Sequence, residues 1–226
     1  MALFIANLMG NHQKVEKWAK WLRVIHAEVS VLAESAAIYS EIRQVVIDNP
    51  RINKSNQFYE WMTKNYVDTT LIRIRRLLDR DKNTVSLSNL LSEMRENLHF
   101  LSRERHLSLY LEGMRSTGEA IFDELAGKDV NGFPVKQLRE DLDCLEQIRA
   151  VHGRYTDKRI AHYDKTKGVE PLGTFQDFDE AVACFEEILK RYNLLLTAHL
   201  IPSLYVLRPS WKEIFKEVWI PPADSR

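Results

Sequence analysis

The feature that most constrains this chain is a long apolar seam that no proline interrupts. From residue 15 to residue 39 apolar side chains recur in steps of three and four, the period of one face of an α-helix. The first proline is Pro50, and the next is Pro134. A helix from about residue 11 to residue 48 would be about 55 Å long at 1.5 Å per residue. Such a helix buries its seam only by packing lengthwise against other helices. The seam consists of Val15, Trp18, Leu22, Ile25, Val29, Leu32, Ala36 and Tyr39.

Turn-forming residues divide the rest of the chain into further helical segments. We expect helices over residues 55–78, 103–125, 134–163 and 174–196. Ser55 and Thr174 are expected to cap two of them, Ser86 or Ser88 to cap a further short helix, and Gly127 to end one. No segment has the two-residue alternation of a strand. The sequence therefore predicts an all-α protein built as an up-and-down helical bundle.

The two ends of the chain differ from the middle. We expect one helical bundle over residues 1–201 and a C-terminal tail over residues 202–226. In the tail, Trp211, Phe215 and Trp219 follow each other at four-residue spacing, which predicts an amphipathic helix folded back on the bundle. The alternative is a partner-binding segment. The mostly apolar stretch from residue 1 to residue 9 is interpreted as a docking arm or the start of the first helix.

Composition excludes several classes of function. The 32 basic and 32 acidic residues balance, so a strongly basic nucleic-acid coat is absent, although a local basic patch stays open. No apolar run approaches the ~20 residues that a membrane span needs, so we expect no membrane partner and a cytoplasmic location. Cys144 and Cys184 lie far apart in sequence and are expected to be reduced thiols rather than a disulfide or a zinc site.

The helix predicted over residues 134–163 changes character along its length. Its early seam is apolar, but heptad steps from Leu145 and Ile148 reach polar and cationic side chains. Basic residues at a helix end also interact favourably with the helix dipole, so part of this pattern needs no function. The polar continuation of the seam consists of His152, Tyr155, Arg159 and His162.

The end of this segment resembles the signature of the HEPN superfamily, the helical domains found in higher eukaryotes and prokaryotes. In that family a late helix has an arginine, four to six further residues and then a histidine, often with an Ala-His pair. The residues here that stand in register with that run are Asp157, Lys158, Ala161, His162 and Asp164.

A second segment agrees with this resemblance. The run from Arg75 and Arg76 through Asp79 to Leu91 is similar to a segment of the abortive-infection-type branch of HEPN proteins. The resemblance implies a HEPN-like core over about residues 11–200. It departs from the family where an arginine is usual, because Thr156 occupies that position. Arg154 precedes His162 by more than the usual spacing, and Arg159 is the other candidate arginine.

The resemblance implies a metal-independent endoribonuclease whose cleft forms between two subunits, with no metal and no cofactor. His162 would take the proton from a ribose 2′-hydroxyl, and Arg154 or Arg159 would stabilise the charged phosphorane. Planar guanidinium groups suit this task because they match two phosphate oxygens. Further roles are implied for two sets of residues. Phosphate or RNA binding is expected from Lys158, Arg75 and Arg76, and a structural role from Asp157, Asp79 and Asp164.

Other interpretations stay open at this stage. His162 could be a structural histidine bonded to Asp79 or Asp164, and the chain could be a non-catalytic HEPN module that binds a nucleotide, RNA or a partner protein. A purely structural helical scaffold is the third reading. The leading hypothesis is an RNA-directed homodimer of a prokaryotic defence or toxin–antitoxin system, with an antitoxin protein as a partner. His99 and His106 are a weak zinc pair, because no further ligand stands at suitable spacing.

Overall fold

The protein is all-α, as the periodicity predicts. A computed structural model describes residues 2–155 and 173–219, with the backbone alone for residues 2–12, 154, 155 and 209. Within these ranges the chain forms helices joined by turns and loops, and no strand is present. Ser102 and Gly132 form one isolated bridge between two loops.

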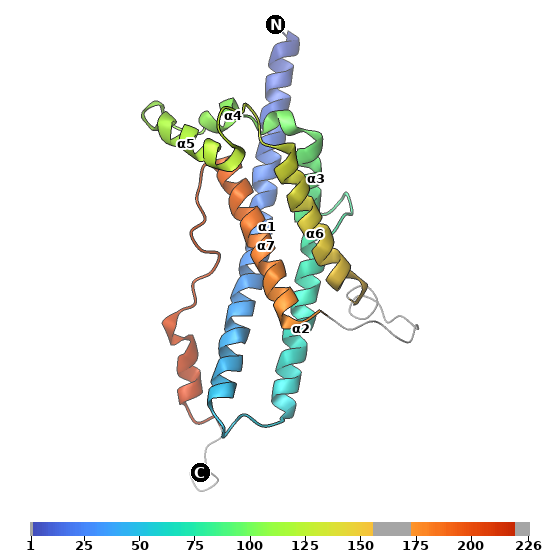
Figure 1. The fold of residues 1–226 in the computed structure, drawn as a ribbon, viewed down its shortest axis with the longest axis vertical. Helices are drawn as coiled ribbons and strands as arrows, with labels where there is room; N and C mark the ends of the chain where they lie inside the picture. The colour runs from blue at the N-terminus through green and yellow to red at the C-terminus, as the bar shows by residue number, and fades with distance from the viewer. Residues whose placement is uncertain (1, 156–172, 220–226) are drawn as a thin grey trace.

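Helix α1 (Ala2–Asp48) forms the long axis of the molecule (Figure 1). Its 47 residues correspond to a length of about 70 Å. The helix begins nine residues before the predicted start at residue 11. The seam is buried: Trp18, Leu22 and Ile25 all lie in the core. The helix ends two residues before Pro50, whose ring disfavours helical backbone in the residue before it.

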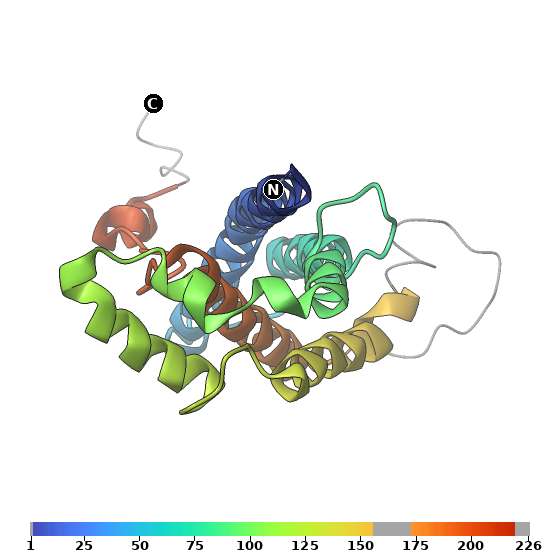
Figure 2. The same ribbon diagram turned by 90° about the horizontal axis from the view of Figure 1, so that it is seen from above.

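Four helices form a closed ring. Helix α2 (Gln57–Leu77) packs on α1 and α6 (Val135–Tyr155), while α7 (Phe175–Thr197) packs on α1 and α6. Consecutive long helices run in opposite directions, which confirms the up-and-down bundle (Figures 1 and 2). The core lies inside this ring, because each helix turns its apolar seam inward.

The shorter helices lie towards the upper end of the bundle in Figure 1. Helix α3 (Leu87–Glu96) packs on α6, and η1 (Leu98–Phe100) follows it. The single helix predicted over residues 103–125 is wrong. The chain forms α4 (Arg103–Leu107), η2 (Glu112–Met114) and α5 (Arg115–Ala126), with α4 packed on both α5 and α7. Because α4 and α5 pack on each other, the chain must turn between them.

Most predicted helix ends are confirmed. Ser86 caps α3 by accepting a hydrogen bond from the Asn89 amide at 3.1 Å. Thr174 and Asp177 form a reciprocal capping box at the start of α7. Gly127 ends α5 with φ of 98°, a left-handed conformation that favours glycine. The predicted Ser55 cap is wrong, because Asn56 caps α2 instead, through the Phe58 amide.

The cysteine prediction is also wrong. Cys144 of α6 and Cys184 of α7 form a disulfide between neighbouring helices, with their Cα atoms 7.0 Å apart. Forty residues separate them in sequence, so only the packing of α6 on α7 brings them together. Among the described helices, none has the length and hydropathy to cross a membrane.

The tail forms a 3-10 helix, η4 (Pro209–Lys216), rather than an α-helix. It lies beside the lower half of α1 (Figure 1). Lys212 forms an ion pair with Glu41 of α1, and Trp219 packs edge-on against Phe58 of α2, with ring centroids 6.5 Å apart. Most of the large apolar side chains of the tail are exposed.

Candidate RNA-binding site

The end of α2 presents the arginines predicted to bind phosphate. Arg75 and Arg76 lie in its last turn and are exposed. Arg73, one turn earlier, pairs with Glu28 of α1 at 2.7 Å, and Arg76 lies 3.7 Å from the same carboxylate. Glu28 therefore holds Arg73 against α1 and leaves the 62% exposed Arg76 side chain in a mostly solvated position.

The loop after α2 is tied to α6 by charge. Arg80 forms an ion pair with Glu146, and Arg149 lies one turn further along α6, with its Nε 3.3 Å from the same Glu146 oxygen. Asp79 organises the loop itself: its carboxylate accepts a hydrogen bond from the Asp81 amide at 3.0 Å, and its carbonyl accepts one from the Ser86 hydroxyl at 2.5 Å. The structural role predicted for Asp79 thus has a local basis in this turn.

The motif itself lies at the limit of the described chain. Arg154 is in the last turn of α6, where the backbone is described but the side chain is not. Five predicted site residues fall outside the described residues. They are Asp157, Lys158, Arg159, His162 and Asp164. Contacts of His162 with Arg154, Arg159, Asp79 or Asp164 therefore stay predictions.

His152 is part of the core rather than of a polar face. It is buried, and its ring stacks on Phe178 of α7 with centroids 5.0 Å apart. Burial lowers the pKa of His152, against the opposing effect of a hydrogen bond to the Asp177 backbone and the Asp177 charge. His152 therefore still belongs to the buried seam of α6, although its side chain is polar. A heptad step from the buried Leu145 was the signal for its burial.

The start of α7 packs closely on the end of α6. A Cβ on Gly173 would lie 2.9 Å from His152 Cε1 and 2.9 Å from Val151 Cγ1, so a larger residue there would collide with α6. Phe175 packs against Tyr39 with ring centroids 5.4 Å apart, and the Arg43 guanidinium lies 4.9 Å from the Phe175 ring centroid. Tyr155 and Gly173 are the described residues on either side of the motif-bearing segment. Both lie where the end of α6 packs against the start of α7.

Sequence reasoning missed a buried polar network on α6. Asp141 is only 5% exposed. It accepts a hydrogen bond from the Tyr192 hydroxyl at 2.8 Å and pairs with Arg191 at 2.5 Å. Burial, together with the Asp141 charge, raises the pKa of Tyr192 well above its ordinary value. Nothing local in the sequence marked Asp141, because its partners come from α7.

The histidine pair considered for zinc is divided by the structure. His106 is buried in α4, where its Nδ1 lies 3.0 Å from the Leu195 carbonyl. The His99 ring packs at a tilt against its neighbour Phe100, with ring centroids 3.9 Å apart. Within residues 2–155 and 173–219 no group of three potential metal-ligating side chains comes together.

A comparison with protein families agrees with the helical bundle. The family model HEPN_AbiU2, described as AbiU2, matches residues 16–217. The chain belongs to the AbiU2 family of HEPN proteins. The match spans most of the sequence, including the segment from Arg75 to Leu91 and the motif that ends at Asp164, and it confirms the predicted abortive-infection-type resemblance. Comparisons with curated proteins and with solved structures gave no match.

Exposed arginines lie at the end of α2, which packs on α6. The exposed end of α2 supplies Arg75 and Arg76, and Arg80 links this end to α6. Neighbouring arginines attract phosphate groups through their charge and through bidentate hydrogen bonds. Glu28 and Glu146 offset part of that charge, so the positive patch is local and agrees with the neutral chain.

Proposed function

We propose that this AbiU2-family protein is an abortive-infection module that acts on RNA as a homodimer and cleaves it without a metal ion. The observation that carries the proposal is the family match over residues 16–217, which contains the whole run from Arg154 to Asp164. The arginine-rich end of α2 beside α6 supports it, because a ribonuclease needs cations near its reacting phosphate.

In the proposed chemistry, residues of the motif accept a proton and donate hydrogen bonds to the phosphate oxygens. A ribose 2′-oxygen attacks the neighbouring phosphorus while His162 takes the 2′-hydroxyl proton, and the bond from phosphorus to the 5′-oxygen breaks as that oxygen takes a proton from water. The products are a 2′,3′-cyclic phosphate and a 5′-hydroxyl. Arg154, or failing that Arg159, stabilises the phosphorane oxygens, while Lys158, Arg75 and Arg76 bind flanking phosphates.

The direct test is cleavage of structured and single-stranded RNA by the purified chain in the presence of EDTA. His162→Ala is expected to reduce the cleavage rate by at least about 100-fold, the usual contribution of a general acid–base group. Separate Arg154→Ala and Arg159→Ala variants identify which arginine serves the phosphate. Lys216→Ala on the tail is the matched control, since it removes an exposed cation far from α6 in sequence. Unchanged cleavage in both His162→Ala and Arg154→Ala would overturn the proposal.

The second candidate is a non-catalytic HEPN module that binds RNA, a nucleotide or a partner such as an antitoxin. Thr156 at the usual arginine position specifically favours it, since threonine cannot supply a bidentate cation. This candidate predicts salt-sensitive RNA binding without cyclic-phosphate products. Filter binding beside the cleavage assay, with Arg75→Ala and Arg76→Ala as variants, separates the two candidates.

A further inference from the structure

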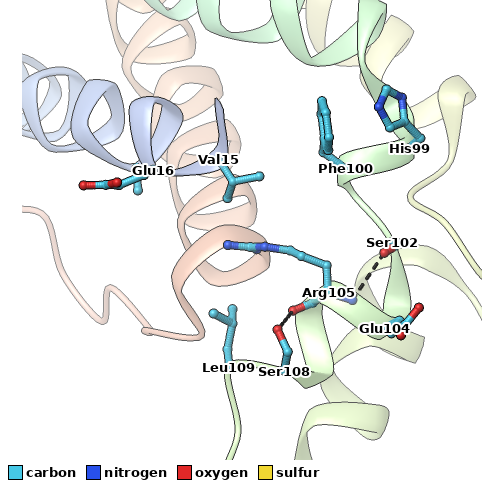
Figure 3. A pocket seen from close by; sticks show the side chains of 10 residues that line it. Val15, Glu16, His99, Phe100, Ser102, Glu104, Arg105, Ser108 and Leu109 are labelled. Atoms are coloured by element: carbon cyan, nitrogen blue, oxygen red, sulfur yellow. Dashed lines mark hydrogen bonds between the residues drawn. The ribbon is translucent and has the colours of Figure 1, made fainter. Parts of the chain in front are cut away.

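A hollow of about 500 Å³ lies between α1 and the stretch from η1 to Leu109 (Figure 3). A volume of this order is typical of pockets that bind small molecules. Val15 and Ala19, one helical turn apart, line the hollow from α1, while Phe100 and Leu109 line it from the other elements. Much of its wall is therefore apolar, and Leu109, which is 39% exposed, still has apolar surface to bury.

Arg105 of α4 supplies the positive charge of this hollow. In Figure 3 its side chain extends into the space between α1 and α4, whereas the Glu16 and Glu104 carboxylates point away from that space. The guanidinium donates to the Leu195 carbonyl at 3.0 Å and to the Leu196 carbonyl at 2.6 Å, both in the last turn of α7. Because an arginine has five N–H donors, these two bonds leave three for a further acceptor.

The charge of Arg105 is only partly balanced within the described chain. The C-terminal end of a helix offers about half an elementary negative charge, and Arg105 forms no ion pair with any described carboxylate. Arg103, two residues earlier, differs in this respect, since it pairs with Glu119 at 2.8 Å and with Asp123 at 2.6 Å. Burial lowers the pKa of Arg105 to about 10, whereas hydrogen bonds to the two carboxylates raise the pKa of Arg103. Arg105 is therefore a partly buried cation that favours an anionic ligand.

We propose that this hollow binds a small carboxylate with an apolar body, whose head group pairs with Arg105. The planar guanidinium matches the two oxygens of a carboxylate, and the apolar wall receives the body. Phe100 is a preformed part of that wall, because Trp18 packs edge-on against it with ring centroids 6.0 Å apart.

The charges around the hollow favour a singly charged head group. Glu16 and Glu104 line its rim, although neither carboxylate points inwards, and Arg105 is the arginine that reaches into it. A phosphate monoester carries more negative charge than a carboxylate at neutral pH, so the rim carboxylates repel it more strongly. A hydrophobic carboxylate therefore fits this hollow better than a nucleotide.

The hollow is separate from the site proposed for RNA cleavage. It lies at the end of the bundle that contains α4 and α5, whereas the last turn of α6 lies towards the other end (Figure 1). Carboxylate binding is measured without RNA, so neither the presence nor the absence of RNA cleavage decides this proposal.

Isothermal titration calorimetry of the full chain tests the site with matched ligands. The probes are 3-phenylpropionate, which has an aromatic body, and octanoate, which has an aliphatic one, and the tighter of the two identifies the preferred body. The neutral amide of each probe has the same body without the charge and should bind at least about tenfold more weakly. Adenosine monophosphate should also bind more weakly than the better carboxylate, because of its phosphate charge.

Variants then test the residues. Arg105→Gln should weaken carboxylate binding at least about tenfold, while Arg115→Gln, at an exposed arginine of α5 outside the hollow, should leave it unchanged. Because Arg105 also binds the end of α7, a second pair of variants keeps it in place. Leu109→Glu adds a negative charge at the rim and should weaken binding, whereas the neutral Leu109→Gln should weaken it less. Glu104→Gln removes a rim carboxylate and should tighten binding.

Several results would overturn the proposal. They are a wild type that binds neither carboxylate, equal binding of each acid and its amide, and binding that survives both Arg105→Gln and Leu109→Glu. Tighter binding of adenosine monophosphate than of either carboxylate would overturn it in favour of a nucleotide site. If Arg105→Gln loses helical circular dichroism, the Leu109 pair and Glu104→Gln decide, because these residues are exposed and their substitution leaves the core intact.

Discussion

Helix α7 and the C-terminal tail contain similar aromatic seams but bury them very differently. In α7, Phe178, Phe185 and Tyr192 are fully inside the bundle. In the tail, Phe215 is 41% and Trp219 is 57% exposed, although their spacing is just as helical. The two segments differ in their neighbours: α7 lies between α1 and α6, whereas η4 lies at one edge of α1. A periodic seam thus shows that a segment can pack, but not that its own chain supplies the packing surface.

The largest expected difference between the two regions is in their cores. Phe185→Ala should reduce the free energy of unfolding by about 3–5 kcal/mol, because it leaves a cavity among fully buried side chains. Phe215→Ala should change it by less than about 1 kcal/mol, since much of that ring is in water already. Urea denaturation followed by circular dichroism measures both. Similar losses for the two variants would show that the tail is an integral part of the bundle.

The polar network between α6 and α7 should be the next most sensitive feature. Asp141→Asn should cost about 2–4 kcal/mol, because the partly buried Arg191 loses its anionic partner. Tyr192→Phe, which removes only the hydroxyl, should cost about 1 kcal/mol. The same urea experiment ranks them. If Asp141→Asn proves neutral, the charge of the buried carboxylate contributes little to the α6–α7 contact.

The buried histidines should make the bundle sensitive to acid. Burial is the main cause that lowers the pKa of both His152 and His106 in the folded state. Folding therefore favours the neutral rings, so their contribution is complete above the unfolded pKa of about 6.5 and is lost as the pH falls through and below it. Thermal unfolding between pH 7 and pH 5 should be less pH-dependent in His152→Gln than in the wild type. An identical pH profile would contradict this origin.

The smallest effect is expected at the tail's ion pair. Lys212→Ala breaks the contact with Glu41, and both side chains are nearly half exposed. Exposed pairs of this kind contribute about 0–1 kcal/mol. Limited proteolysis near residue 205 is the more sensitive measurement, because release of η4 would expose that connection. Faster cleavage in Lys212→Ala, with unchanged global stability, would show that the tail detaches separately from the bundle.

Much of the fold followed from local patterns. The seam of α1, the capping residues Ser86 and Thr174 and the stop at Gly127 were all recognisable, because each depends on neighbours within a few residues. The break between α4 and α5 was not, since it comes from packing at the end of the bundle. The family is confirmed by the match over residues 16–217, while the roles of Arg154 and His162 stay predictions.

The sequence by itself determined the helical class, the face of α1 that is buried and the AbiU2-like motif that ends at Asp164. Only the tertiary structure decided which polar and apolar residues are buried, where Asp141 finds Tyr192, and how Cys144 meets Cys184. The physical reason is that helical periodicity and capping are set over three or four residues. Burial depends instead on which helices, distant in sequence, pack together. A similar aromatic seam is therefore buried in α7 and exposed in the tail.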